Sequence, residues 1–92
     1  MESVLNLCIN IQMFSVTDCN GTIHPVQFKF RDNSGEIITV RIQNVECTNQ
    51  TTNNLNIIFN CTAVICDTLK RFELRYNTMQ HKWYLSKIQF IN

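Results

Sequence analysis

The chain has 92 residues, 45% of them hydrophobic, and its eight Lys and Arg nearly balance its seven Asp and Glu to give a net charge of +1. This length suffices for one modest core, so residues 1–92 are expected to form a single domain. The near-neutral charge excludes a strong whole-protein field that would draw the chain to polyanions or to an anionic membrane surface.

Apolar residues recur at every second position in the first run, which covers residues 5–13. Side chains on a strand point alternately to the core and to solvent, so this alternation predicts a strand. A helix over residues 4–11 is the weaker alternative. The sequence Asp-Cys-Asn-Gly at residues 18–21 then predicts a turn in which Gly21 takes a positive φ.

The second and third runs predict a hairpin. Val26, Phe28 and Phe30 follow Pro25, which suits the start of a strand because proline cannot donate to the ladder. Residues 32–35 form the turn. Residues 38–45 alternate again and predict a third strand that ends near Val45. Residues 46–54 are polar and predict a loop, the longest in the chain.

The remaining runs predict three more strands. Residues 56–66 are apolar on one phase and mixed on the other, which favours a central strand or a barrel strand covered on both sides. Residues 69–76 fit a fifth strand, although the spacing of their apolar residues also allows a helix. Residues 77–81 form the last hairpin loop, and the sixth strand begins at Trp83 and continues through Phe90.

These runs predict an all-β fold: a single small antiparallel barrel or half-barrel of about six strands, SH3-like or a similar meander. Curling of the sheet would also remove exposed edges. Five residues occupy the apolar phase of their runs and are expected to face one interior: Phe28, Val40, Phe59, Leu74 and Trp83.

The chain has five cysteines, at positions 8, 19, 47, 61 and 66, which cannot all pair within one chain. The closest two, Cys61 and Cys66, are five residues apart, which is neither zinc-knuckle nor CxxC spacing. Reduced thiols used as small apolar residues are therefore expected, with no metal and no cofactor.

The N-terminal residues predict neither export nor membrane insertion. Glu2 stands where a secretory signal would carry basic residues, and Asn6, Asn10 and Gln12 interrupt the apolar positions. Apolar runs also fall short of the roughly 18 to 20 residues that span a bilayer as a helix. We expect a cytoplasmic protein without a membrane segment.

Familiar catalytic motifs are not recognisable. His24 precedes Pro25 and His81 lies in a hairpin loop, and a histidine base needs a positioned partner, such as Asp18 or Asp67, that a sequence cannot place. The serines sit in no nucleophile elbow, and two glycines cannot build a phosphate-cradling loop. We expect a protein that is not an enzyme.

The polar phase of the strands carries basic residues that could track a nucleic-acid backbone, with an aromatic ring to stack a base. The candidate face consists of Lys29, Arg31, Arg41, Arg71, Arg75 and Tyr84. The opposing interpretation is a solvated face that Asp32, Glu36 and Glu73 neutralise across strands. With a net charge of only +1 the second interpretation is favoured, and single-stranded nucleic-acid binding is the alternative function.

Several short motifs follow one another over residues 13–85: Asp18-x-x-Gly21, Pro25-Val26-x-Phe28, Ile38-x-Val40-x-Ile42-x-x-Val45, Cys61, Leu74-x-Tyr76 and Lys82-Trp83-x-Leu85. In this order the chain resembles a group of short uncharacterised all-β proteins of clostridia and related Gram-positive bacteria. The N-terminal strand, the Asn-rich segment and the tail after Leu85 depart from that pattern. The resemblance implies a bacterial cytoplasmic protein and no catalytic activity.

The function expected from these observations is a non-enzymatic binding or assembly module that acts through an exposed strand edge or an apolar face. The high apolar content of so short a chain favours self-association or a protein partner. Pairing with a second copy is expected through an outer strand, either the last, residues 87–92, or the first, residues 5–13.

Overall fold

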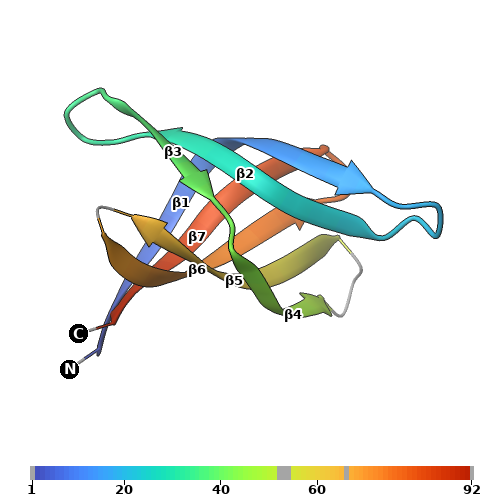
Figure 1. The fold of residues 1–92 in the computed structure, drawn as a ribbon. Coiled ribbons are helices and arrows are strands. Elements are labelled where there is room, and N and C mark those ends of the chain that lie inside the picture. Colours follow the sequence, from blue (N-terminus) through green and yellow to red (C-terminus); the bar gives the residue numbers. More distant parts are fainter. Residues whose placement is uncertain (1, 52–54, 66, 92) are drawn as a thin grey trace.

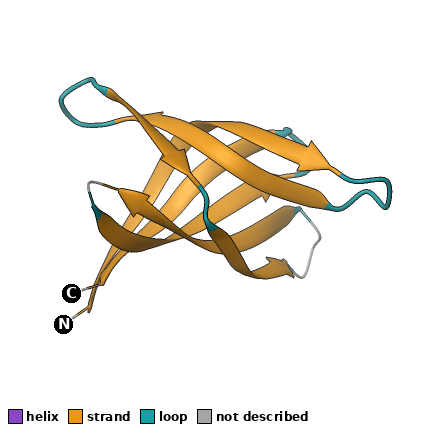
Figure 2. Ribbon diagram, viewed as in Figure 1, coloured by secondary structure: helices purple, strands orange, loops and turns teal. Residues whose placement is uncertain are grey.

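The computed structural model describes residues 2–51, 55–65 and 67–91, and these form strands, turns and short connections (Figures 1 and 2). No helix occurs in the described ranges, so residues 4–11 and 69–76 are strands, as the favoured interpretation predicted. The strands are β1 (Glu2–Thr17), β2 (Ile23–Arg31), β3 (Ile37–Arg41), β4 (Asn44–Gln50), β5 (Asn56–Ile65), β6 (Thr68–Asn77) and β7 (Lys82–Ile91).

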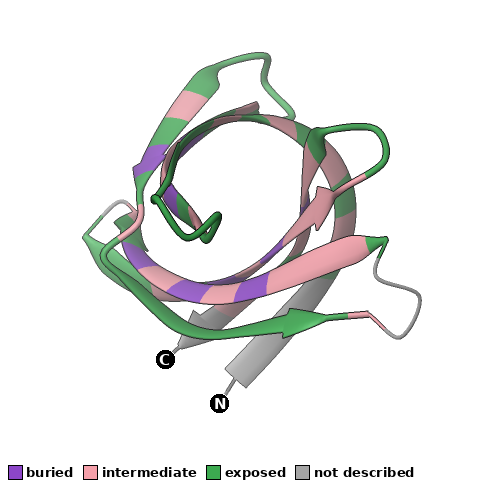
Figure 3. Ribbon diagram, turned by 90° about the vertical axis from the view of Figure 1, so that its right-hand side faces the viewer, coloured by how far each residue is buried: buried purple, intermediate pink, exposed green. Residues whose placement is uncertain are grey.

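All seven strands belong to one antiparallel sheet with the order β3-β2-β1-β7-β6-β5-β4. The edge strands β3 and β4 follow each other in the chain, with only Ile42 and Gln43 between them. Two residues can join opposite edges only if the sheet curls, and Figure 3 shows the strands surrounding the core as a ring. The predicted all-β meander, curled into a half-barrel, is confirmed.

The crossing from β3 to β4 closes the curl at one point. The main-chain N–H of Ile42 donates to the carbonyl of Val26 on β2, and that of Gln43 donates to the carbonyl of Thr62 on β5, both at 2.9 Å. The segment 37–50 therefore pairs with β2 in its first half and with β5 in its second half. This change of partner makes seven strands where six were predicted.

The loop predicted for residues 46–54 is wrong for most of its length. Residues 46–50 belong to β4, which pairs with β5 from Asn44↔Thr62 to Gln50↔Ile57, and residues 52–54 lie outside the described ranges. All seven β4 residues are exposed. An edge strand with so little burial needs no apolar alternation, so its polar sequence resembled that of a loop.

The last strand is not an outer strand, so the premise for pairing residues 87–92 with a second copy is wrong. β7 lies between β1 and β6, with Lys87 opposite both Asn6 and Glu73. The first strand is also central in the sheet order: β1 pairs with β7 through residues 2–11 and with β2 through Gln12–Thr17. The outer strands are β3 and β4.

The core lies on the concave side of the sheet. Phe28, Val40, Phe59 and Leu74 are buried, as predicted, and Trp83 is partly buried against them. The buried core cluster also includes Cys61, Ala63, Phe72 and Leu85. Burial raises the pKa of the Cys61 thiol to about 12, so this cysteine serves as a small apolar residue.

Candidate functional site

The residues of the predicted basic face lie in two groups. Arg71 and Arg75 lie on β6 and Tyr84 lies on β7, whereas Lys29, Arg31 and Arg41 lie on β2 and at the end of β3. Strands β1 and β7 separate β2 from β6 in the sheet. Lys29 and Arg31 therefore lie apart from Arg71, Arg75 and Tyr84 along the sheet, whereas Arg41 precedes the crossing at Gln43, which bonds to Thr62, the β5 residue opposite Arg71.

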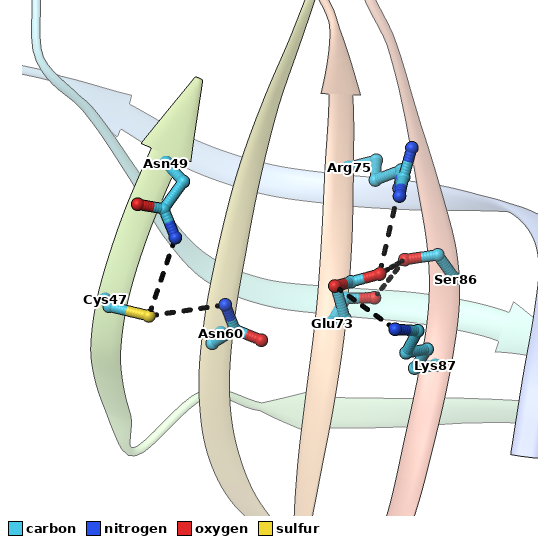
Figure 4. Close-up of polar contacts among 7 residues, drawn as sticks. All are labelled: Cys47, Asn49, Asn60, Glu73, Arg75, Ser86 and Lys87. Carbon is cyan, nitrogen blue, oxygen red and sulfur yellow. Dashed lines mark hydrogen bonds and ion pairs between the residues drawn. The ribbon is translucent and has the colours of Figure 1, made fainter. Parts of the chain in front are cut away.

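Three basic side chains on β6 and β7, those of Arg71, Arg75 and Lys87, are paired with acids. Nε of Arg71 donates to Oε1 of Glu46 at 3.3 Å. Glu73 lies 3.7 Å from Nε of Arg75 and 3.9 Å from Nζ of Lys87, and it accepts a hydrogen bond from Oγ of Ser86 at 2.8 Å (Figure 4). Glu73 thus neutralises its neighbours, and Glu46 is a partner that the sequence did not indicate.

Arg31, the last residue of β2, contacts the turn at residues 32–36 that follows it. Oδ1 of Asp32 accepts from the hydroxyl of Ser34 at 2.6 Å and from the N–H of Glu36 at 2.9 Å, and Nη1 of Arg31 donates to the carbonyl of Gly35 at 2.7 Å. The Ser34 hydroxyl is the main cause that lowers the pKa of Asp32. Arg31 and Asp32 are therefore held by the hairpin.

Two shallow hollows flank Glu73 on the outer face. One, of about 510 Å³, is lined by Glu46, Arg71 and Lys87 among others. The second, of about 350 Å³, is lined by Arg75 and Tyr84 among others. Because both hollows include Glu73 as well as cations, neither offers the uniformly positive lining that a phosphate backbone needs.

The four cysteines in the described ranges are all unpaired. Sγ of Cys47 accepts from the side-chain amides of Asn60 at 3.3 Å and Asn49 at 4.0 Å (Figure 4). Cys8, Cys19 and Cys47 are free and exposed. Within the described residues no group of three or more His, Cys, Asp or Glu side chains lies close enough to hold a metal ion.

Both histidines make local contacts at hairpins. Nε2 of His24 lies 3.0 Å from Oδ2 of Asp18, the partner that the sequence had suggested. This hydrogen bond is the main cause that lowers the pKa of Asp18, and the N–H of Thr22 adds to it. Nδ1 of His81 lies 2.9 Å from the hydroxyl of Tyr76. Asp18 also accepts the N–H of Asn20, so the His24 contact belongs to the turn.

A different feature appears where the half-barrel is open. A groove of about 370 Å³ runs between the start of β2 and the strand β4, and we call it the seam groove. Its walls and floor include Ile23 and Pro25 on β2, Thr48 and Gln50 on β4, and Ile57 and Phe59 on β5. In Figure 1 the two walls are the teal start of β2 and the green β4.

The hydrogen-bond pattern of β4 shows which of its main-chain groups face the groove. The N–H of Thr51 donates to the carbonyl of Asn56, and hydrogen-bonded pairs alternate along an antiparallel ladder. In this register Asn49 and Cys47 bond to β5. Thr48 and Gln50 consequently direct both their N–H and C=O groups away from β5, toward the groove.

The hydrogen-bond pattern of β2 likewise shows which main-chain groups of the opposite wall face the groove. The N–H of Asp18 donates to the carbonyl of Thr22, so His24 forms the next hydrogen-bonded pair with β1. Ile23 and Pro25 then direct their main-chain groups away from β1. Pro25 is buried and has no N–H, so this wall offers two carbonyls but only the N–H of Ile23.

The sequence had pointed to the basic face and to no residue of this groove. Two weak features of the sequence are consistent with a strand at the β4 wall. Only a short span separates the alternation that ends at Ile42 from the apolar residue Val45, and threonine, a residue type enriched in strands, occurs at positions 48 and 51. Nothing local shows that residues 23–25 and 45–50 face each other, because that depends on the curl.

Comparison of the chain with protein-family models, with curated proteins and with solved structures finds no match. The resemblance to short clostridial proteins therefore stays a prediction. No helix in the described part of the chain is long and apolar enough to cross a membrane.

Proposed function

We propose that the protein is a non-enzymatic binding or assembly module that acts through the open edge of β4. The observation that carries the proposal is that β4 pairs with β5 alone while all seven of its residues are exposed. An unpaired edge presents a row of N–H and C=O groups that can pair with another chain.

The end of β4 lacks the devices that usually block such an edge, which are proline, charged residues and bulges. Its first half carries Glu46 and a bulge between Val45 and Cys47. The second half, Thr48–Gln50, is uncharged and contains no proline. The accessible edge is thus confined to a short segment, which is more consistent with selective pairing than with general aggregation.

The free thiols support the predicted compartment. Cys8, Cys19 and Cys47 are exposed and unpaired, which suits a reducing environment such as the cytoplasm. The bacterial origin implied by the resemblance belongs to the same proposal. Single-stranded nucleic-acid binding remains the disfavoured alternative, because Arg71, Arg75 and Lys87 form ion pairs with Glu46 and Glu73.

A pair of Thr→Pro variants tests the proposal. Proline at Thr48 removes an N–H that faces the open edge and leaves the ladder to β5 intact. Thr39 is the matched control: it lies on the other outer strand, β3, and its N–H faces away from β2, because Val40 and Ile42 make the bonds to that strand.

Two measurements look for an edge partner: light scattering over a concentration series, and selection from a displayed library of random extended peptides. We expect binding of a second copy or of a peptide that Thr48→Pro weakens and Thr39→Pro leaves unchanged. A monomeric mass at high micromolar concentration, together with no peptide sensitive to Thr48→Pro, would overturn the proposal.

A further inference from the structure

The proposed edge function leaves the form of the partner open, and the seam groove narrows it. We infer that the groove receives a single extended, uncharged peptide segment, which pairs with Thr48 and Gln50 and places an apolar side chain over Ile57 and Phe59. This inference rests on the proposed function and specifies its occupant.

The two walls of the groove decide between a single strand and a folded edge. Thr48 and Gln50 form one wall, and Ile23 and Pro25 form the other. Neighbouring strands in a sheet lie about 4.8 Å apart, so the edge strand of another sheet brings its own neighbour with it. A strand that enters between two walls must have no neighbouring strand of its own on either side. A peptide tail or loop meets this condition, and the edge strand of a second barrel does not.

The wall on β2 cannot satisfy all the hydrogen-bonding groups that the main chain of β4 directs into the groove, and this leaves room for an added strand. Pro25 supplies a carbonyl without an N–H, so direct pairing of the two walls would leave main-chain groups of β4 without a donor. The main-chain groups of Thr48 and Gln50 thus remain available to an incoming segment.

The floor sets the side-chain preference. Phe59 is buried with its ring 5.3 Å from that of Trp83, Ile57 packs partly against the core, and Val45 adds apolar surface at the β4 wall. His24 is the single ionisable residue that lines the groove among those described, and it is engaged with Asp18. An uncharged segment with an aromatic or branched apolar residue matches this lining.

The geometry also fixes which amides of the segment matter. Residues that form a hydrogen-bonded pair across an antiparallel ladder have side chains on the same face. The side chains of Thr48 and Gln50 line the groove, so the segment's residues bonded to them also point their side chains to the floor. Methylation of those amide nitrogens blocks pairing, whereas methylation of the intervening amides does not.

The probe is the fluorescein-labelled peptide Lys-Thr-Thr-Phe-Thr-Val-Thr-Lys, titrated with the full chain and followed by anisotropy. Trp83 is the chain's one tryptophan and touches the groove's floor residue Phe59, so its emission gives a label-free second readout. Loss of the hydrogen bond to Thr48 is expected to weaken binding about tenfold in Thr48→Pro, with Thr39→Pro unchanged.

Three altered peptides complete the test. N-methylation of Phe and Val, or replacement of Phe by Asp, is expected to abolish binding, and N-methylation of the two Thr residues that flank Phe, whose amides face the β2 wall, is expected to weaken it much less. Equal loss with both methylation patterns, or no binding of the probe, overturns the inference. If the probe fails while Thr48→Pro still abolishes self-association, the edge function stands and only the single-strand occupant is wrong.

Discussion

Replacing Phe59 by alanine should destabilise the domain strongly, because this ring joins the core to the floor of the seam groove. Phe59 is 2% exposed, lies opposite Leu74 on β6 and Thr48 on β4, and contacts Trp83. Truncation of a buried phenylalanine costs about 3–5 kcal/mol in free energy of unfolding. The adjoining groove lets neighbouring side chains relax into the space left by the ring, so we expect the free energy of unfolding to fall by about 3 kcal/mol.

Phe14 provides a matched control, since its side chain is 64% exposed. Full burial of a phenylalanine contributes about 1.5–3 kcal/mol, so a residue that is mostly exposed should cost less than about 1 kcal/mol when it is truncated. Both variants are measured by urea unfolding with circular dichroism, where the expected slope of about 1–3 kcal/mol/M makes the difference resolvable.

If Phe59→Ala cannot fold, Phe59→Leu keeps most of the volume and should cost about 1–1.5 kcal/mol. A loss for Phe59→Ala below about 1 kcal/mol, or equal to that for Phe14→Ala, would refute the assignment of the inward-facing phase on β5 and with it the floor of the seam groove.

Hydrogen bonds from His24 and Ser34 lower the pKa values of Asp18 and Asp32 below their ordinary 3.8. The stabilisation of the fold by these two carboxylates is therefore present above pH 3.8 and is lost as the pH falls through their lowered pKa values. The Asp18→Asn, Asp32→Asn double variant should show a smaller loss of stability over this acid range, measured by urea unfolding at each pH. Iodoacetamide at about pH 8 should modify Cys8, Cys19 and Cys47 but spare Cys61 until urea unfolds the chain, as peptide mass spectrometry would show, and modification of native Cys61 would contradict its burial. Mixed single-stranded oligonucleotides at about 0.15 M salt should show no salt-sensitive binding, and tight binding that Arg71→Glu with Arg75→Glu abolishes would restore the nucleic-acid alternative.

Alternation along the chain was sufficient to predict the buried strands. Phe28, Val40, Phe59 and Leu74 each lie on the apolar phase of a run, and each is buried. Alternation carries information only where one face of a strand is buried and the other is not. It therefore failed on β4, where every residue is exposed.

Strand neighbours and charge pairs depended on the curl, which no local pattern encodes. The sequence could not place the last strand beside the first, so β7 looked like an edge although β1 and β6 both pair with it. The contact of Arg71 with Glu46, 25 residues away along the chain, arises for the same reason: β4 and β6 both flank β5. The basic face was predicted from strand phases alone and fell into two groups.

The position of the seam groove follows from how the curl is closed. A barrel removes its edges only when every strand has two partners. Here the strand path from Ile37 to Gln50 changes partner at Ile42 and Gln43, so each half pairs on one side only. The half that faces Pro25 meets a wall with a missing donor, and the partly buried Ile57 and the exposed Val45 line the groove beside it. The half-barrel thus closes its core through one two-residue crossing and, for the same reason, leaves β3 and β4 as open edges, of which β4 borders the groove.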